Sequence, residues 1–331
     1  MTKLKISGLK ESAEAIAPTD NGTYSHIGSK GGTEQMYEGL TQRVDPSLLE
    51  NFNIICSRVR SVDENKMNIL WLHDTWDDPE SQHLKDKKSL DRFTKLVFVS
   101  NYQQSTFNIG LNVPYDKGIV LQNAIVPFED HVKEKDGPIR LIYHTTPHRG
   151  LELLVPVFEH LADQRNLDIV LDVYSSFEIY GWKQRDEPYL KLFDRCRAHP
   201  KINYHGYQPN EVVREALKKA HIYAYPNIWP ETSCISVLEA MSAGCTVVCS
   251  NMAALPETCA NFAAMYNWNE DHNKHANTFA GVLNMAVQNF WDEQNQAKLH
   301  MQRIFFNNFY NWNLRAAQWD GFLRSLLQNS K

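Results

Sequence analysis

The sequence predicts an α/β protein built from two parallel-sheet units. Short apolar runs rich in β-branched residues alternate with longer segments of helical periodicity, which is typical of parallel sheets covered by helices. The length of 331 residues suits about two domains. An apolar content of 43% is sufficient for packed cores and excludes wholesale disorder, collagen and coiled coil.

The expected elements alternate along the chain in that order. The strands of the first unit are expected at Leu4–Ser7, Asn53–Ser57, Asn68–His73, Lys95–Ser100 and Ile119–Asn123. Those of the second are expected at Ile139–His144, Ile169–Tyr174, Ile202–His205, Ile222–Tyr225, Thr246–Ser250 and Ala263–Tyr266. Helices are expected at Gly150–Gln164, from one apolar face, and at Asn210–Ala220, with Asn210 as its cap.

The polar segment Phe128–Pro138 is expected to be a solvated linker between two Rossmann-like domains, residues 1–130 and 131–309. Ligands in such folds bind beyond the carboxyl ends of the strands. The aromatic stretch Phe305–Leu327 has near-helical spacing and is expected to be a packing helix, with about 310–331 returning to the N-terminal domain.

Charge and composition exclude several functional classes. Lys and Arg number 34 against 39 Asp and Glu, a net charge of -5, which argues against general nucleic-acid binding. The sequence shows no signal-peptide pattern and no apolar run long enough for a membrane span, although a local patch leaves peripheral membrane contact open. The six cysteines lack the spacing of a zinc site and suggest a reduced, cytoplasmic protein.

The most informative stretch is Tyr225–Ser250, in which a strand, a loop with two prolines and a helix follow one another. The helix is expected to start near Ser233 or Cys234 and to end near Ala243, before a left-handed Gly244. The backbone N–H groups of the helix start would form an anion site. Glu231 and Glu239 bracket that site, and the alternative is that both carboxylates simply face solvent.

This E-x7-E pattern followed by AMSAGCTVV resembles the donor-binding motif of retaining glycosyltransferases of the GT-B fold, family 4. The resemblance covers about residues 31–323 and implies two Rossmann-like domains facing across a cleft, with a short N-terminal, acceptor-side domain. It implies that Glu231 contacts the donor sugar and Glu239 the nucleotide ribose. Thr232, Ser233, Cys234 and Ile235 would then bind the diphosphate.

Three further segments resemble family motifs in the expected order. Gly31 and Gly32 look like the glycine-rich N-terminal motif, where backbone approaches the ligand, although a plain loop is equally consistent. His73, at a predicted strand end, matches the family histidine near the donor sugar. Gly206 and Tyr207 are implied to line the nucleobase pocket, with a tight turn and a packed tyrosine as the alternative.

The segment Tyr143–Gly150 resembles the part of the family that supplies cations to the diphosphate. Arg149 stands where the family has a lysine, and His144 stands where it has an arginine. One fixed cation is therefore expected instead of two, with His144 or His148 contributing hydrogen bonds. Asn123, in a motif that departs from the family form, is expected to be structural.

The resemblance implies transfer of a sugar from a nucleotide sugar, such as a UDP- or GDP-sugar, to a hydroxyl of a glycan or glycoconjugate. Arg149 and the helix amides would stabilise the departing diphosphate, without metal or cofactor and with retention of configuration. His73, Arg149 and Glu231 are the expected catalytic residues. Asp74, Asp77 and Asp78 are expected to lie in a solvated loop. A non-catalytic nucleotide-sugar binder and a glycoside hydrolase are the alternatives.

Overall fold

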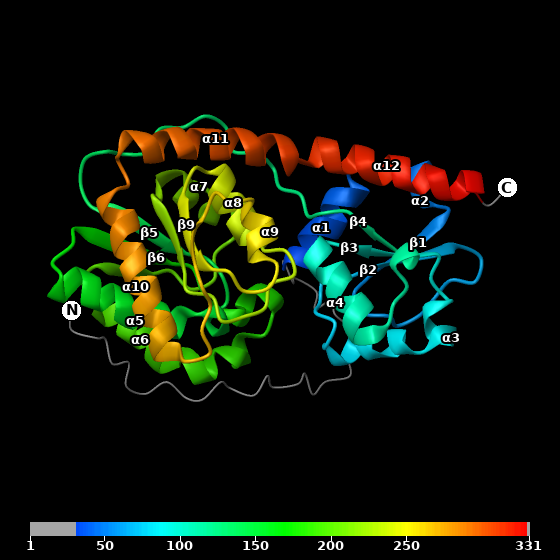
Figure 1. Cartoon of the computed structure of the whole chain (residues 1–331), viewed down its shortest axis with the longest axis horizontal. Coiled ribbons are helices and arrows are strands. Elements are labelled where there is room, and N and C mark those ends of the chain that lie inside the picture. The colour runs from blue at the N-terminus through cyan, green and yellow to red at the C-terminus, as the bar shows by residue number, and fades with distance from the viewer. Residues whose placement is uncertain (1–30, 330–331) are drawn as a thin grey trace.

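The computed structural model describes residues 31–329 as two parallel sheets with helices on both faces (Figure 1). One sheet has the strand order β1-β2-β3-β4 and the other β10-β9-β8-β5-β6-β7, and every neighbouring pair is parallel. The α/β class predicted from the sequence is confirmed. The strand expected at Leu4–Ser7 lies outside the described residues.

The ten strands coincide with the other ten expected segments, apart from shifts of one to three residues at their ends. They are β1 Phe52–Cys56, β2 Met67–Trp71, β3 Lys95–Phe98, β4 Gly118–Val120, β5 Ile139–Tyr143, β6 Ile169–Val173, β7 Ile202–Tyr204, β8 Ile222–Tyr225, β9 Thr246–Ser250 and β10 Ala264–Tyr266. Several strands end before the polar residue that was expected to close them, and these residues begin the loops that follow.

The helices occupy the segments between the strands. The α-helices are α1 Gly32–Thr41, α2 Pro46–Leu49, α3 Lys87–Leu90, α4 Asn101–Leu111, α5 Leu151–Glu159, α6 Leu190–Ala198, α7 Asn210–Lys219, α8 Ile235–Ser242, α9 Leu255–Cys259, α10 His272–Gln288, α11 Glu293–Phe309 and α12 Trp312–Asn329. Short 3-10 or π turns are η1 Pro79–Lys85, η2 Tyr115–Lys117, η3 Pro147–Arg149, η4 His160–Gln164, η5 Phe177–Tyr180 and η6 Lys183–Tyr189.

Alternating side chains of the four-stranded sheet pack into separate cores on its two faces. Ile69 and Trp71 of β2 belong to the cluster that includes α1 and α12, whereas Leu70 belongs to the cluster that includes α4. This alternation is the ordinary consequence of strand geometry. The six-stranded sheet has a larger core of its own.

The segment Phe128–Pro138 does connect the two sheets, but the expectation that it is solvated throughout is wrong. Phe128 is buried in the core of the six-stranded sheet. Arg214 Cζ lies 3.9 Å from the centroid of the Phe128 ring, and Lys133 donates from Nζ to the Leu217 carbonyl (3.1 Å) near the end of α7. Carbonyls at a helix end need donors, and the linker supplies one.

The aromatic C-terminal stretch forms two helices instead of the single expected one. The break falls at Tyr310 and Asn311, where Asn311 Oδ1 accepts from the Leu314 N–H (2.8 Å) and caps α12. Figure 1 shows α11 and α12 following one another along the top of the molecule, the first beside the six-stranded sheet and the second beside the four-stranded one. Phe306 packs in the first core and Trp319 in the second.

Within residues 31–329, no helix has the length and apolar character needed to cross a bilayer. All six cysteines are free thiols, and five of them are buried.

We expect Gly39→Ala to lower the free energy of unfolding by ~1–3 kcal/mol, the usual cost of overpacking. A Cβ atom at Gly39 in α1 would lie 2.1 Å from the ring of Trp312 in α12. Thermal denaturation measures the effect. The control is Gly321→Ala, where nothing lies within 4 Å of the new atom, so stability should stay the same or rise. Equal effects of the two substitutions would contradict this packing.

Candidate nucleotide-sugar site

The loop between β8 and α8 is held tightly to its own sheet. The Ser250 N–H and hydroxyl both donate to Asn227 Oδ1 (3.0 and 2.9 Å). The Ala254 N–H donates to the Glu231 carbonyl (3.0 Å). Buried backbone polar groups require such partners, so the loop has a defined path into α8.

The same loop is also bonded to the four-stranded sheet. The Ser100 hydroxyl donates to the Thr232 carbonyl (2.6 Å), and Asn123 Nδ2 donates to the Ser233 carbonyl (3.2 Å). The Thr232 hydroxyl donates in turn to the His73 carbonyl (2.7 Å). The loop therefore lies where the two halves of the chain meet, and Asn123 helps to hold it there.

Helix α8 begins at Ile235, as the sequence predicted to within one or two residues. Its N-cap residue is Cys234, whose side chain makes no capping hydrogen bond, so the first amides of the helix are not satisfied by a capping side chain. Gly244 follows the helix with φ +72, the expected left-handed position. A Cβ atom at Gly32 would lie 2.9 Å from Ile235 Cδ1, which places the start of α1 against the start of α8.

Arg149 and Glu231 form an ion pair at this loop. Gly150 makes the approach possible because, at φ +137, a Cβ atom there would lie 2.3 Å from the Pro226 carbonyl oxygen. Arg149 Nη1 and the Tyr225 hydroxyl both donate to Glu231 Oε1, and Arg149 Nε donates to Thr146 Oγ1 (3.2 Å). Burial alone would lower the pKa of Arg149, but Glu231 more than offsets this, so the pKa lies above its usual value and the guanidinium stays charged.

His73 is a neutral imidazole in a mostly buried position. Its backbone N–H donates to Ser57 Oγ (2.9 Å), and its ring lies 4.8 Å from that of Trp71, which contacts Trp319 of α12 at the same centroid distance. Burial lowers the pKa of His73 to about 3, offset only in part by the Trp71 backbone. His73 is thus suited to orienting a ligand and not to carrying a positive charge.

His144 and His148 are neutral for the same reason. Burial lowers the pKa of His144 to about 3, offset in part by the Ser236 backbone, and its ring packs on Tyr223 at 4.5 Å. Burial, with Arg149 and then Arg185, also holds the pKa of His148 well below its usual value. His144 therefore supplies no second fixed cation in place of the family arginine.

Glu239 is buried on α8 and does not face solvent. Arg214 Nη1 donates to its Oε1 at 3.0 Å, and Asn210 Nδ2 approaches the same atom at 3.4 Å. Burial raises the pKa of Glu239, and Arg214 opposes that rise. The expectation that Asn210 caps α7 is wrong: Pro209 is the N-cap residue, and the Asn210 side chain is directed to Glu239.

The remaining predicted residues are Gly31, Gly206 and Tyr207. Gly31 is the N-cap residue of α1 and a Cβ atom there would meet the Tyr180 ring at 2.6 Å. Gly206, at φ +64, and Tyr207 follow β7 in a half-buried turn.

Among residues 31–329, no group of three or more His, Cys, Asp or Glu side chains is arranged to hold a metal ion.

Comparison with known proteins finds a family that is similar to part of this chain. Residues 127–284 match the family model described as Glycosyl transferases group 1. The O-antigen chain mannosyltransferase B of Escherichia coli is 33% identical over 185 residues, which are 51% of this chain and 46% of that protein. The chain thus spans less than half the length of this relative.

The similar solved structures extend over both halves of the chain. A glycosyltransferase from Rickettsia africae ESF-5 has a TM-score of 0.65 at 14% identity and covers 90% of this chain and 81% of its own. Anabaena Alr3699/HepE in complex with UDP-glucose has a TM-score of 0.61 at 12% identity over 78% of this chain and 72% of its own. The fold is GT-B. Residues 127–284, slightly less than half of the chain, are similar to a group 1 glycosyltransferase domain.

Sequence reasoning missed a contact that joins the half with the six-stranded sheet to the half with the four-stranded sheet. The Glu257 carboxylate accepts from the Asn101 N–H (2.9 Å), the Asn101 side-chain amide (2.8 Å) and the Tyr102 N–H (2.9 Å). It therefore caps α4 across the interface, where a carboxylate is favoured. No local pattern indicates this role, because the partners are about 155 residues apart in the sequence.

The solvated loop expected for Asp74, Asp77 and Asp78 is wrong for two of the three residues. Asp77 is exposed. Asp78 caps η1 by accepting from the Glu80 N–H (2.8 Å) and pairs with Arg58 (3.6 Å). Burial, followed by the charge of Asp78, raises the pKa of Asp74 to about 6. Asp74 directly follows His73, whose carbonyl is bonded to Thr232 of the other half. Asp74 therefore lies near the interface between the two halves.

We expect Asp74→Asn to raise the free energy of unfolding at pH 8 by up to about 3 kcal/mol, at about 1.4 kcal/mol for each pKa unit. The folded-state pKa of about 6 lies above the ordinary 3.8, so the native state holds this proton more tightly than the unfolded chain does. The stability contributed by Asp74 is therefore present below pH 4 and lost as the pH rises through 6.

Urea denaturation at pH 4, 6 and 8 measures this dependence. The stabilisation by Asp74→Asn should vanish toward pH 4, and the exposed control Asp77→Asn should change stability little at any pH. A lower free energy of unfolding for Asp74→Asn than for the wild type at pH 8 would refute the inference that the buried charge of Asp74 destabilises the fold.

Proposed function

We propose that the chain transfers a sugar from a nucleotide sugar to an acceptor hydroxyl. The observation that supports this most directly is the start of α8, without a capping side chain, beside the charged Arg149 at the junction of the two sheets. Backbone amides at a helix start and an arginine are a suitable pair of groups for a diphosphate. The match to group 1 glycosyltransferases, and the UDP-glucose held by the Anabaena neighbour, support the same ligand class.

The proposed catalysis is electrostatic. Departure of the nucleoside diphosphate concentrates negative charge on phosphate, and preorganised donors stabilise that charge in the transition state. Arg149 uses Nη1 and Nε for Glu231 and Thr146, while a guanidinium has five N–H donors in total. Donor binding would add phosphate contacts to a side chain that is already oriented.

We extend the proposal to the finer points that the resemblance to family 4 implies. The transfer would proceed without a metal ion or cofactor and with retention of configuration, through front-face attack in which the leaving phosphate helps to accept the acceptor's proton. The neutral His73 would orient the donor sugar, Glu231 would contact it, and Glu239 would bind the ribose. A cytoplasmic location and a glycan or glycoconjugate acceptor remain predictions.

A non-catalytic nucleotide-sugar binder is the second candidate, and the neutral His144 favours it because one cation of the family pair is missing. Incubation with UDP-glucose, UDP-N-acetylglucosamine and GDP-mannose, after a thermal-shift screen of UDP, GDP and ADP, separates the two candidates. Nucleotide binding with neither transfer nor donor hydrolysis would support the binder. The glycosidase alternative is disfavoured because each of the two carboxylates already pairs with its own arginine.

We expect Arg149→Ala to lower kcat by about 10²–10³-fold, the usual loss for a group that stabilises transition-state charge. Arg149→Lys should recover part of the rate, because a point charge remains but the planar fork is lost. Arg165→Ala, at an exposed position of the same domain, is the control and should leave kcat unchanged. An unaltered kcat in a folded Arg149→Ala protein would remove Arg149 from the mechanism.

We expect Glu239→Gln to weaken nucleotide binding about tenfold, a loss of about 1.4 kcal/mol that is typical of a hydrogen bond to a charged group. Isothermal titration calorimetry with the nucleotide selected by the thermal-shift screen measures the change. Glu215→Gln, on the exposed side of α7, is the matched control. Equal dissociation constants for the wild type, Glu239→Gln and Glu215→Gln would exclude the role of Glu239 in binding the ribose.

A further inference from the structure

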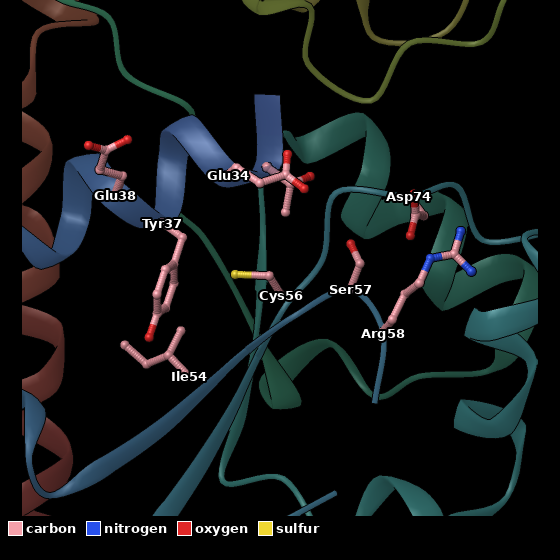
Figure 2. A pocket seen from close by; sticks show the side chains of 9 residues that line it. Glu34, Tyr37, Glu38, Ile54, Cys56, Ser57, Arg58 and Asp74 are labelled. Carbon is pink, nitrogen blue, oxygen red and sulfur yellow. The ribbon is translucent and has the colours of Figure 1, made fainter. Parts of the chain in front are cut away.

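A pocket of about 440 Å³ lies in the N-terminal half, and none of the residues that line it is among the predicted site residues (Figure 2). It is formed by the first turns of α1, by β1 and by the loops that follow β1 and β2. The described residues that line it are Thr33, Glu34, Tyr37, Glu38, Ile54, Cys56, Ser57, Arg58 and Asp74. Its volume is within the range of small-molecule sites.

The pocket lies beside the start of α8. Asp74 directly follows His73, whose carbonyl accepts from the Thr232 hydroxyl (2.7 Å). Thr33, which also lines the pocket, follows Gly32, which packs closely against Ile235. A group bound in the pocket would therefore be next to the place proposed for the donor.

The carboxylates of Glu34, Glu38 and Asp74 give this pocket a negative character. Figure 2 shows Glu34 and Glu38 on α1 and Asp74 at the other end of the lining. Like charges disfavour an anionic ligand by several kcal/mol when solvent is excluded, whereas carboxylates accept hydrogen bonds from sugar hydroxyls readily.

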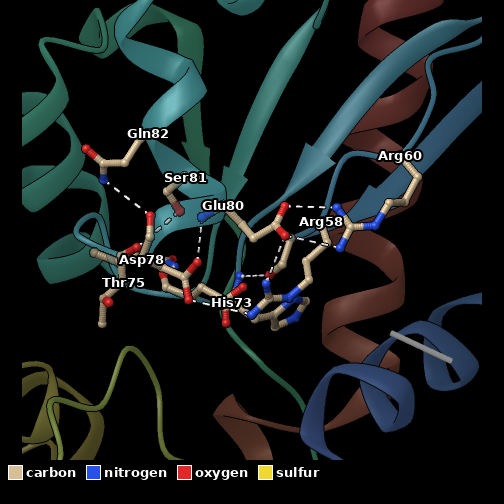
Figure 3. Close-up of polar contacts among 11 residues, drawn as sticks. Arg58, Arg60, His73, Thr75, Asp78, Glu80, Ser81 and Gln82 are labelled. Atoms are coloured by element: carbon tan, nitrogen blue, oxygen red, sulfur yellow. Dashed lines mark hydrogen bonds and ion pairs between the residues drawn. The ribbon is translucent and has the colours of Figure 1, made fainter. Parts of the chain in front are cut away.

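Arg58, the positively charged residue of this described lining, offsets the carboxylates only in part. Its guanidinium pairs with Asp78 at 3.6 Å and with Glu80 at 3.4 Å, and Glu80 also pairs with Arg60 at 2.9 Å. Figure 3 shows these side chains gathered in one network. The charge of Arg58 is thus balanced by carboxylates that are not part of the pocket lining.

The rest of the lining suits a sugar ring. Tyr37 is 45% exposed and, with Ile54, gives an apolar surface at one side. The Thr33 and Ser57 hydroxyls add polar groups that can both donate and accept. An apolar surface with a few placed polar groups is the usual composition of a small-molecule site.

We propose that this pocket receives the acceptor and that Glu34 and Asp74 make it selective for an uncharged, hydroxyl-bearing sugar residue over one that carries a phosphate or carboxylate. The use of the pocket for an acceptor rests on the proposed function. The selectivity rests on the charges of the lining.

Saturation-transfer-difference NMR on the full chain, with UDP or GDP present, tests the selectivity directly. The neutral probes are methyl α-mannoside, methyl α-glucoside and methyl α-N-acetylglucosaminide, and the anionic probes are mannose 6-phosphate and glucose 6-phosphate. Methyl α-mannoside should bind at least tenfold more tightly than mannose 6-phosphate, or methyl α-glucoside at least tenfold more tightly than glucose 6-phosphate. Glu34→Gln and Asp74→Asn should each weaken the neutral probe three- to tenfold and reduce the discrimination.

Thr33→Trp fills the pocket from the first turn of α1 and should abolish the neutral signal, whereas Glu50→Gln, at an exposed position of the same half, should not change it. The inference is overturned by equal binding of neutral and phosphorylated probes, by the absence of any neutral signal, or by a signal that survives Thr33→Trp in a folded protein.

Calorimetry with UDP and GDP on the same variants distinguishes the two proposals. Failure of these two nucleotides and of ADP to bind the wild-type chain would defeat the proposed function, while a sugar signal that is lost in Thr33→Trp would still support the pocket. Normal nucleotide binding with no pocket-dependent sugar signal would defeat the inference alone.

Discussion

The position of the loop between β8 and α8 is the constraint on which the candidate site depends. Its Glu231 carbonyl is bonded from within its own half, and its Thr232 and Ser233 carbonyls are bonded by Ser100 and Asn123 of the other half. Residues from both halves, each with its own sheet and core, thereby fix the position of this one short segment. The start of α8, the ion pair of Arg149 and the backbone of His73 all follow from where that segment lies.

Charge in this region is distributed in pairs that cross element boundaries. Glu231 is paired with Arg149, Glu239 with Arg214, and Asp78 with Arg58. Removing one member of such a buried pair leaves an uncompensated charge, which is far more costly than the pair itself is stabilising. The histidines follow the opposite rule, since burial keeps them neutral. The loop between β8 and α8 thus has the charged Arg149 and uncharged imidazoles around it.

Much of this architecture is predictable from local sequence because it depends on local physics. The strands β8 and β9 and the boundaries of α8 follow from apolar runs, prolines and Gly244. The contacts of Glu257 with α4 are not predictable in this way, because a carboxylate that caps a helix of another domain has no neighbouring signal. The same limit explains the error at Asp74: its acidic surroundings suggest solvent, whereas its burial is set by strands and loops far away in the chain.

Within residues 31–329, the two places where the chain crosses between the halves lie side by side. The Ile125 N–H donates to the Tyr310 carbonyl (2.8 Å), and Ile125 also forms an isolated bridge with Asn311. Both covalent connections therefore pass through nearly the same point. A motion that opened the molecule would have to be a rotation with its hinge at residues 125 and 310–311, and it would separate the Thr232 and Glu257 contacts while leaving the hinge contacts in place.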